Sequence, residues 1–164
     1  MLESCKSAKE RWGGVSTLID NWLNARQEML VLYCSITGID QREGDSASLQ
    51  DKLRDFCQLL IDYVSTGHFE IYEQLAQEAL EFEDESALAE SSQLFSALRT
   101  NTNKCLDFND KCEKLGSMPA LQKKLSDIGE ALEERFLVED RLIAVLHKAH
   151  SGDSSDERVS AGLR

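Results

Sequence analysis

Three histidines, five cysteines and thirty carboxylates are the side chains of this 164-residue chain with the chemistry to act as catalysts or metal ligands. Catalysis by His68, His147 or His150 would require a serine or cysteine nearby in space, which their positions in the sequence do not indicate. The chain also contains no G-x-S-x-G, P-loop or G-x-G-x-x-G motif. We therefore predict a protein that is not an enzyme, has no catalytic residues and uses no cofactor.

Metal binding is a more specific alternative to catalysis, because helical bundles hold metals with Glu-x-x-His or His-x-x-x-Glu pairs on an inner face. His68 is followed four positions later by Tyr72, and Glu73 comes one position too late for that spacing. Glu70 and Glu73 would also repel a phosphate on His68, which disfavours a phosphotransfer domain. We predict no metal ligands, although a hemerythrin-like bundle that binds a metal or a small ligand stays open as an alternative.

The cysteines indicate a reducing environment. Their number is odd and no pair has C-x-x-C spacing, so we expect reduced thiols, several of them buried on apolar helix faces. The five cysteines are Cys5, Cys34, Cys57, Cys105 and Cys112.

The N-terminus lacks the apolar segment of a secretion signal, and no run approaches about 18 apolar residues. We therefore expect a cytoplasmic protein without a membrane span.

The distribution of charge is the most informative feature. The net charge of −12 disfavours direct binding to nucleic acid and favours a basic protein partner. Residues 55–98 contain ten acids and no lysine or arginine, and residues 127–140 contain six acids and only Arg135. If these two segments lie side by side, they form one strongly negative surface. The alternative is an ordinary solvated face of an acidic protein.

The spacing of apolar residues predicts helices throughout, because they recur every three or four positions and strand-like runs are missing. A single proline leaves room for long helices. We predict an all-α, up-down antiparallel helical bundle, with a four-helix core and a short N-terminal helix that ends at Gly13-Gly14. One domain would cover residues 1–150, followed by a disordered tail over 151–164. The predicted helices are 2–12, 15–37, 48–65, 68–82, 87–115 and 117–150.

A break is expected within the acidic segment, at Ser65-Thr66-Gly67. Gly67 could adopt the left-handed conformation that ends one helix, and Ser65 or Thr66 could cap the next. Such a bend exposes polar backbone groups and aromatic edges, which suits recognition of a partner. The alternative is a capped helix junction in which His68 is hydrogen-bonded locally, and both interpretations can hold together.

Three blocks of sequence resemble the Rsd/AlgQ family of anti-sigma factors, and together they span roughly residues 1–150 in order. The opening and the cysteines are most similar to the AlgQ branch of pseudomonads. The blocks are Arg11-Trp12-Gly13-Gly14 with Leu18-Ile19-Asp20 and Trp22-Leu23; Asp55-Phe56-Cys57-Gln58 with Asp62-Tyr63-Val64-Ser65, Gly67-His68-Phe69 and Ile71-Tyr72-Glu73; and 125–133 with Arg135-Phe136 and Glu139-Asp140.

This resemblance implies a bundle that binds region four of the primary sigma factor of RNA polymerase. By sequestering it, such a protein would lower the association of the sigma factor with core polymerase and with promoter −35 DNA. The family resemblance also implies control of stationary-phase or virulence-type genes, such as those for alginate. Region four is a basic helix-turn-helix, which agrees with the charge argument. An adaptor for another signalling protein, such as a phosphocarrier or a stress-signalling enzyme, stays open.

We expect the partner to bind at the bend. Asp62, with Glu70 and Glu73, would pair with arginines of region four, and Phe69 and Tyr72 would supply apolar contacts. The full predicted set is Asp62, Ser65, His68, Phe69, Glu70, Tyr72 and Glu73.

A second acidic patch is expected at Glu130 and Glu134. Arg26 lies with Trp22 on an otherwise apolar stripe, so it either pairs internally with an acid such as Glu130 or Glu134 or reaches an interface. We favour the internal ion pair.

Overall fold

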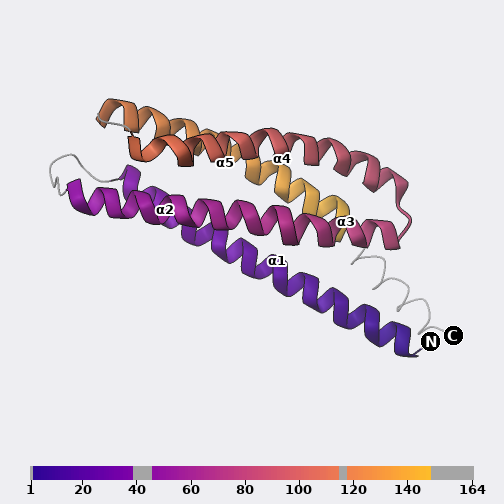
Figure 1. Cartoon of the computed structure of the whole chain (residues 1–164). Helices are drawn as coiled ribbons and strands as arrows, with labels where there is room; N and C mark the ends of the chain where they lie inside the picture. The colour runs from indigo at the N-terminus through magenta and orange to yellow at the C-terminus, as the bar shows by residue number, and fades with distance from the viewer. Residues whose placement is uncertain (1, 39–45, 115–117, 149–164) are drawn as a thin grey trace.

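The computed structural model describes residues 2–38, 46–114 and 118–148, and all the regular structure in these ranges is helical. This confirms the predicted all-α bundle (Figure 1). No helix in the described part is both long and apolar enough to cross a membrane. The elements are α1 (Leu2–Thr37), α2 (Ser46–Thr66), the π-helical turn η2 (Gly67–Ile71), α3 (Tyr72–Glu81), α4 (Glu85–Lys111), the 3-10 turn η3 (Cys112–Lys114), α5 (Met118–Ile143) and the π-helical turn η4 (Ala144–Lys148).

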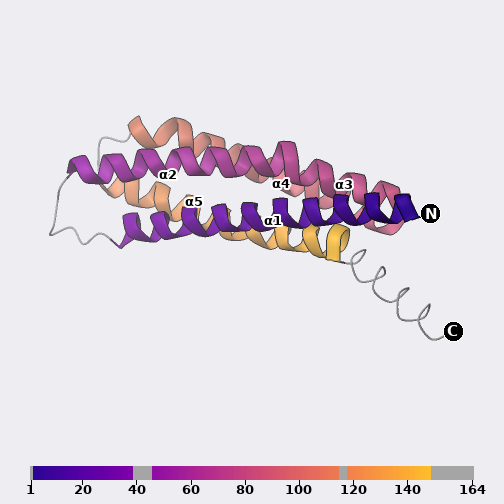
Figure 2. The ribbon, with the colours of Figure 1, turned by 90° about the horizontal axis from the view of Figure 1, so that it is seen from below.

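The helices pack in a ring around one core. α1 packs against α2, α2 against α4, and α4 against α5. Side chains close the ring between α1 and α5, where the Tyr33 hydroxyl donates to the Leu125 carbonyl at 2.7 Å. α2, η2 and α3 follow one another without a loop and form one long rod (Figure 2). The chain reverses after α3 at Glu83, which has a φ of 52°, and Asp84 caps α4 by accepting the Ala87 amide at 2.9 Å.

The expected break at Gly13-Gly14 is wrong, since α1 runs through both glycines as one helix. A glycine in a helix interior costs about 1 kcal/mol relative to alanine, which weakens a helix without ending it. Downstream, α1 is held by a buried face that includes Val15, Ile19 and Trp22. Residues 39–45, which lie between the predicted helices 15–37 and 48–65, and the tail 151–164 are outside the described residues.

The expected break at Gly67 is also wrong. Thr66 has helical φ and ψ and makes no capping hydrogen bond, and no described glycine has a positive φ. Gly67 instead serves close packing, because a Cβ there would lie 3.1 Å from Cζ2 of Trp22 and 3.2 Å from the Tyr72 hydroxyl. The helix continues past Gly67 through the π-helical turn, which sets the geometry of the site described next.

Candidate protein-docking site

Five of the seven predicted contact residues project into solvent from the α2–η2–α3 rod. Asp62, His68, Glu70 and Glu73 are exposed, and Phe69 is 71% exposed. The other two are more enclosed, since Ser65 is half-buried and Tyr72 is only 5% exposed.

Tyr72 lies inside the bundle, contrary to its expected role as an apolar contact for a partner. Its hydroxyl accepts a hydrogen bond from Arg135 Nη2 at 3.0 Å, and its ring meets those of Trp22 and Phe95 at centroid distances of 6.0 and 5.9 Å. A ring fixed in this way is not available for docking. Tyr72 instead supports the face from beneath, because the His68 ring stands edge-on to it at 5.9 Å.

The π-helical turn explains why Glu70 faces solvent while Tyr72 is buried. An α-helix returns to the same face after about seven residues. Here the buried pairs follow that spacing except across η2, where eight positions separate Tyr63-Val64 from Ile71-Tyr72. A π-helical turn accommodates one additional residue, and such turns are frequent at functional sites. The four buried pairs are Phe56-Cys57, Tyr63-Val64, Ile71-Tyr72 and Glu78-Ala79. This irregular spacing was the signal that sequence reasoning missed.

Part of the acidic segment is paired or acts as a helix cap within the protein. Glu78 is 6% exposed and lies 3.0 Å from Nδ1 of His147, and Glu90 pairs with Arg141 at 2.7 Å. Asp84 is the cap of α4. The remaining acids of residues 55–98 are all exposed: Asp55, Asp62, Glu70, Glu73, Glu81, Glu83 and Glu85.

The acids of α2 and those of α5 do not share one surface. The Tyr63 ring of α2 packs edge-on against the Phe136 ring of α5 at 6.0 Å, and the Tyr63 hydroxyl donates to Glu139. Because α2 and α5 meet through their buried faces, their exposed faces point away from each other. In the expected second patch, Glu130 is exposed and Glu134 is paired with Lys104 of α4 at 3.1 Å.

A buried polar network that the sequence did not indicate lies directly behind the candidate docking face. Arg135 and Glu139 are both 0% exposed. Nε of Arg135 lies 2.7 Å from Oε1 of Glu139 and forms an ion pair with it, although the two atoms are not aligned for a hydrogen bond. Arg26 Nη2 approaches Glu139 at 3.3 Å, and Arg26 Nη1 meets Asp140 at 2.8 Å. The internal pairing of Arg26 is thus confirmed, but its partners are Glu139 and Asp140 rather than Glu130 or Glu134.

The polar middle of α4 completes this network. Asn101 is buried, and its Nδ2 donates to the Ala131 carbonyl at 2.7 Å. Arg135 Nη1 donates to Thr102 Oγ1 at 3.0 Å and to Asn101 Oδ1 at 3.4 Å. Polar residues in the centre of α4 are therefore partners for a buried guanidinium.

Burial sets the protonation of the network. It raises the pKa of the Tyr63 and Tyr72 phenols far above their usual value, so both remain protonated. Burial by itself lowers the pKa of Arg135, but Tyr72 and Glu139 outweigh it and raise this pKa overall. The network thus joins α1, α2, α4 and α5 through charged hydrogen bonds in the bundle interior.

Three side chains, from α1, η4 and α3, are arranged in the order of a Ser-His-Glu catalytic triad. Ser16 Oγ lies 3.2 Å from Nε2 of His147, whose Nδ1 faces Glu78. Acyl transfer also needs free backbone amides to stabilise an oxyanion. Ser16 lies inside α1, where the amides are used by the helix. We interpret these three side chains as a structural link between α1, α3 and η4.

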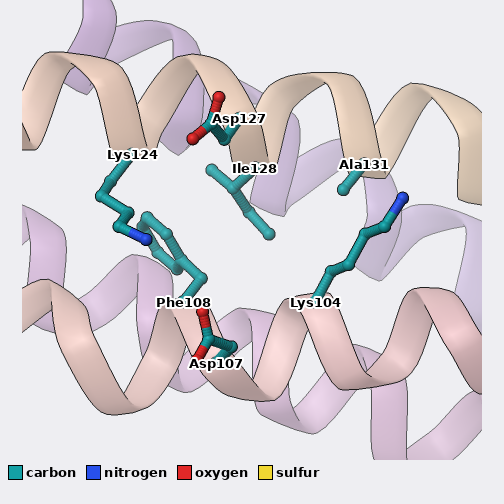
Figure 3. A pocket seen from close by; sticks show the side chains of 7 residues that line it. All are labelled: Lys104, Asp107, Phe108, Lys124, Asp127, Ile128 and Ala131. Atoms are coloured by element: carbon teal, nitrogen blue, oxygen red, sulfur yellow. The ribbon is translucent and has the colours of Figure 1, made fainter.

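A shallow groove of about 160 Å³ lies between α4 and α5 (Figure 3). Ligand pockets usually span roughly 300–1,000 Å³, so this groove is small for a cofactor. Among the described residues, no three His, Cys, Asp or Glu side chains gather as metal ligands. The groove is lined by Lys104, Asp107, Phe108, Lys124, Asp127, Ile128 and Ala131.

Comparison with known proteins agrees with the resemblance seen in the sequence. Residues 1–147 match the family described as "Regulator of RNA polymerase sigma(70) subunit, Rsd/AlgQ". A protein named "Regulator of sigma D" from Yersinia enterocolitica is 40% identical over 148 residues, covering 87% of this chain and 88% of the relative. One of the same name from Salmonella arizonae is 37% identical over 158 residues, covering 93% and 96%. The chain belongs to the Rsd/AlgQ family of regulators of the RNA polymerase sigma(70) subunit.

Proposed function

We propose that this protein regulates transcription by binding region four of the primary sigma factor through the exposed face of η2 and its flanking helices. The observation that carries the proposal is Phe69, which is 71% exposed between the acids Asp62, Glu70 and Glu73. An exposed aromatic ring surrounded by charge of one sign is typical of a contact surface for a partner of the opposite sign.

A basic helix-turn-helix fits this face in charge. Its recognition surface already carries the arginines and lysines that contact DNA phosphates. Those same residues would pair with Asp62, Glu70 and Glu73, and an apolar position of the partner would cover Phe69. Binding would then compete with promoter −35 DNA. This mechanism needs no catalysis, and it would operate in the cytoplasm, where RNA polymerase works.

Two substitutions test the face directly. Phe69→Ala should weaken binding to isolated region four by roughly 10- to 100-fold, because it removes a central aromatic contact. Asp62→Arg should weaken it by roughly 10-fold or more, because it places like charges together. Both affinities are measured by calorimetry, with circular dichroism to confirm the fold.

Leu137→Ala is the matched control, because Leu137 is 69% exposed but lies on α5, whose exposed face points away from the docking face. Its affinity should stay within about twofold of the unmodified protein. The proposed face would be wrong if Leu137→Ala weakened binding while Phe69→Ala and Asp62→Arg did not.

A further inference from the structure

Two buried cysteines from different helices lie in direct contact. The sulfurs of Cys57 on α2 and Cys112 at the start of η3 are 2.8 Å apart. Non-bonded carbon atoms pack at about 3.5–4.0 Å, and a disulfide bond is about 2.05 Å long. Since the two sulfurs already lie closer than ordinary packing, we infer that Cys57 and Cys112 are an oxidative modification site that forms a reversible disulfide.

The surroundings favour this pair. Cys57 and Cys112 are 6% and 3% exposed, which excludes larger thiol reagents from the contact. Cys112 follows directly after the last residue of α4, in a 3-10 turn. Helix ends open locally more readily than helix centres, so a peroxide can reach these sulfurs and the backbone can adjust to the shorter bond.

The other described cysteines are placed differently. Cys105 is 0% exposed, its sulfur is directed at Asn101 Oδ1 at 3.7 Å, and burial raises the pKa of its thiol. Cys34 is exposed on α1. Exposure favours reaction of Cys34 with external reagents, whereas proximity favours an internal bond between Cys57 and Cys112.

The oxidation needs a two-electron oxidant, and hydrogen peroxide is the simplest. One thiolate attacks a peroxide oxygen, the O–O bond breaks, and a sulfenic acid forms with release of water. The second sulfur then attacks the sulfenic sulfur, and the departing hydroxyl takes up a proton to leave as a second water. Overall, two S–H bonds and one O–O bond are lost, and one S–S bond and two O–H bonds of the released water molecules form. A dithiol reductant reverses the reaction.

The disulfide would join residues 55 positions apart and enclose η2, α3 and α4 in a covalent loop. A loop of this length restricts the unfolded chain strongly. Oxidation should therefore raise the midpoint of thermal unfolding by roughly 10 °C. This inference is independent of sigma-factor binding.

The test treats the full-length reduced protein with hydrogen peroxide, blocks remaining thiols under denaturing conditions and maps peptides without reduction. The expected product is a Cys57–Cys112 cross-linked peptide that dithiothreitol removes. The matched variant Cys34→Ser should still form it, whereas Cys57→Ser and Cys112→Ser should not. The inference is overturned if both cysteines are fully alkylated after Cys34 has oxidised, or if cross-links join other pairs. Mapping of the unmodified protein gives this answer even if a variant fails to fold.

Discussion

At the residue scale, the centre of the bundle is held by charges rather than by apolar contacts alone. Arg135 and Glu139 occupy the same stripe of α5 as Leu132 and Leu142, at positions where an apolar side chain would be expected. The spacing of four residues between Arg135 and Glu139 is that of a helical ion pair. Taking both charges out of water is unfavourable, so the pair depends on the partners that Tyr63, Tyr72 and Asn101 provide.

Removing one charge of this pair should destabilise the protein strongly. Arg135→Met keeps most of the side-chain volume but leaves Glu139 buried with a weaker set of partners. We expect the free energy of unfolding to fall by about 3–5 kcal/mol, measured by chemical denaturation. The double variant Arg135→Met/Glu139→Leu should recover a large part of this loss, because it removes both buried charges.

The exposed pair Lys104–Glu134 is the control, since its side chains are 53% and 57% exposed. Lys104→Ala should change stability by less than about 1 kcal/mol. An Arg135→Met protein as stable as the unmodified one would show that the buried pair does not hold the core.

At the element scale, the π-helical turn η2 sets which residues of the rod are buried and which are exposed. It brings Gly67 against Trp22, and Trp22 is itself stacked on Tyr63 at a centroid distance of 4.9 Å. Trp22 also donates from Nε1 to the Tyr63 carbonyl at 3.2 Å. The indole is thus fixed on two sides, so it cannot easily shift to admit a side chain at position 67.

Gly67→Ala should therefore destabilise the protein, although alanine is the better helix former by about 1 kcal/mol. Its Cβ would lie 3.1 Å from a ring that cannot easily move, and we expect a net loss of about 1–2 kcal/mol in thermal or chemical unfolding. Ser92→Ala, at an exposed position of α4, should be neutral or slightly stabilising. If Gly67→Ala were stabilising, the close approach would not be what requires glycine.

The sequence predicted the helical class, the apolar stripes and the exposure of Asp62, Phe69 and Glu73, because these depend on local periodicity. It failed at Gly67, where a break was expected, because a single glycine did not reveal the additional residue of η2. It also assigned Tyr72 to the partner contact, although Tyr72 lies on the buried stripe of the helix. It also failed to pair Arg26 with Glu139 and Asp140, because such partners depend on how distant helices meet.

At the scale of the whole molecule, each of the three tyrosine hydroxyls is hydrogen-bonded to another helix. Burial raises the pKa of Tyr33, Tyr63 and Tyr72 above the usual value of about 10. In the unfolded chain they would ionise near that usual value. Their contribution to stability is therefore fully present below about pH 10 and is lost as the pH rises above it.

Alkaline titration should show this coupling. Phenolate absorbance should stay low in the folded protein near pH 10 and rise together with the loss of helical circular dichroism at higher pH. The chain unfolded in denaturant should titrate near pH 10 with full amplitude. Full phenolate absorbance near pH 10 with helicity intact would contradict the burial of these hydroxyls.

The net charge of −12 and the exposed acids of the α2–η2–α3 rod attract basic protein surfaces to the molecule. Opposite charges accelerate association, and salt screens them over about 8–10 Å at physiological ionic strength. The regulator should therefore associate with its partner faster at low salt than at high salt, whereas an apolar contact such as Phe69 should act mainly on dissociation.

The most direct test of the central claim is calorimetry of the full-length protein with isolated region four of the host's primary sigma factor, at two salt concentrations. We expect one-to-one binding at micromolar or tighter affinity that weakens as salt is raised. Absence of binding at micromolar concentrations, or an affinity indifferent to salt, would contradict the proposal that this acidic face captures a basic sigma-factor domain.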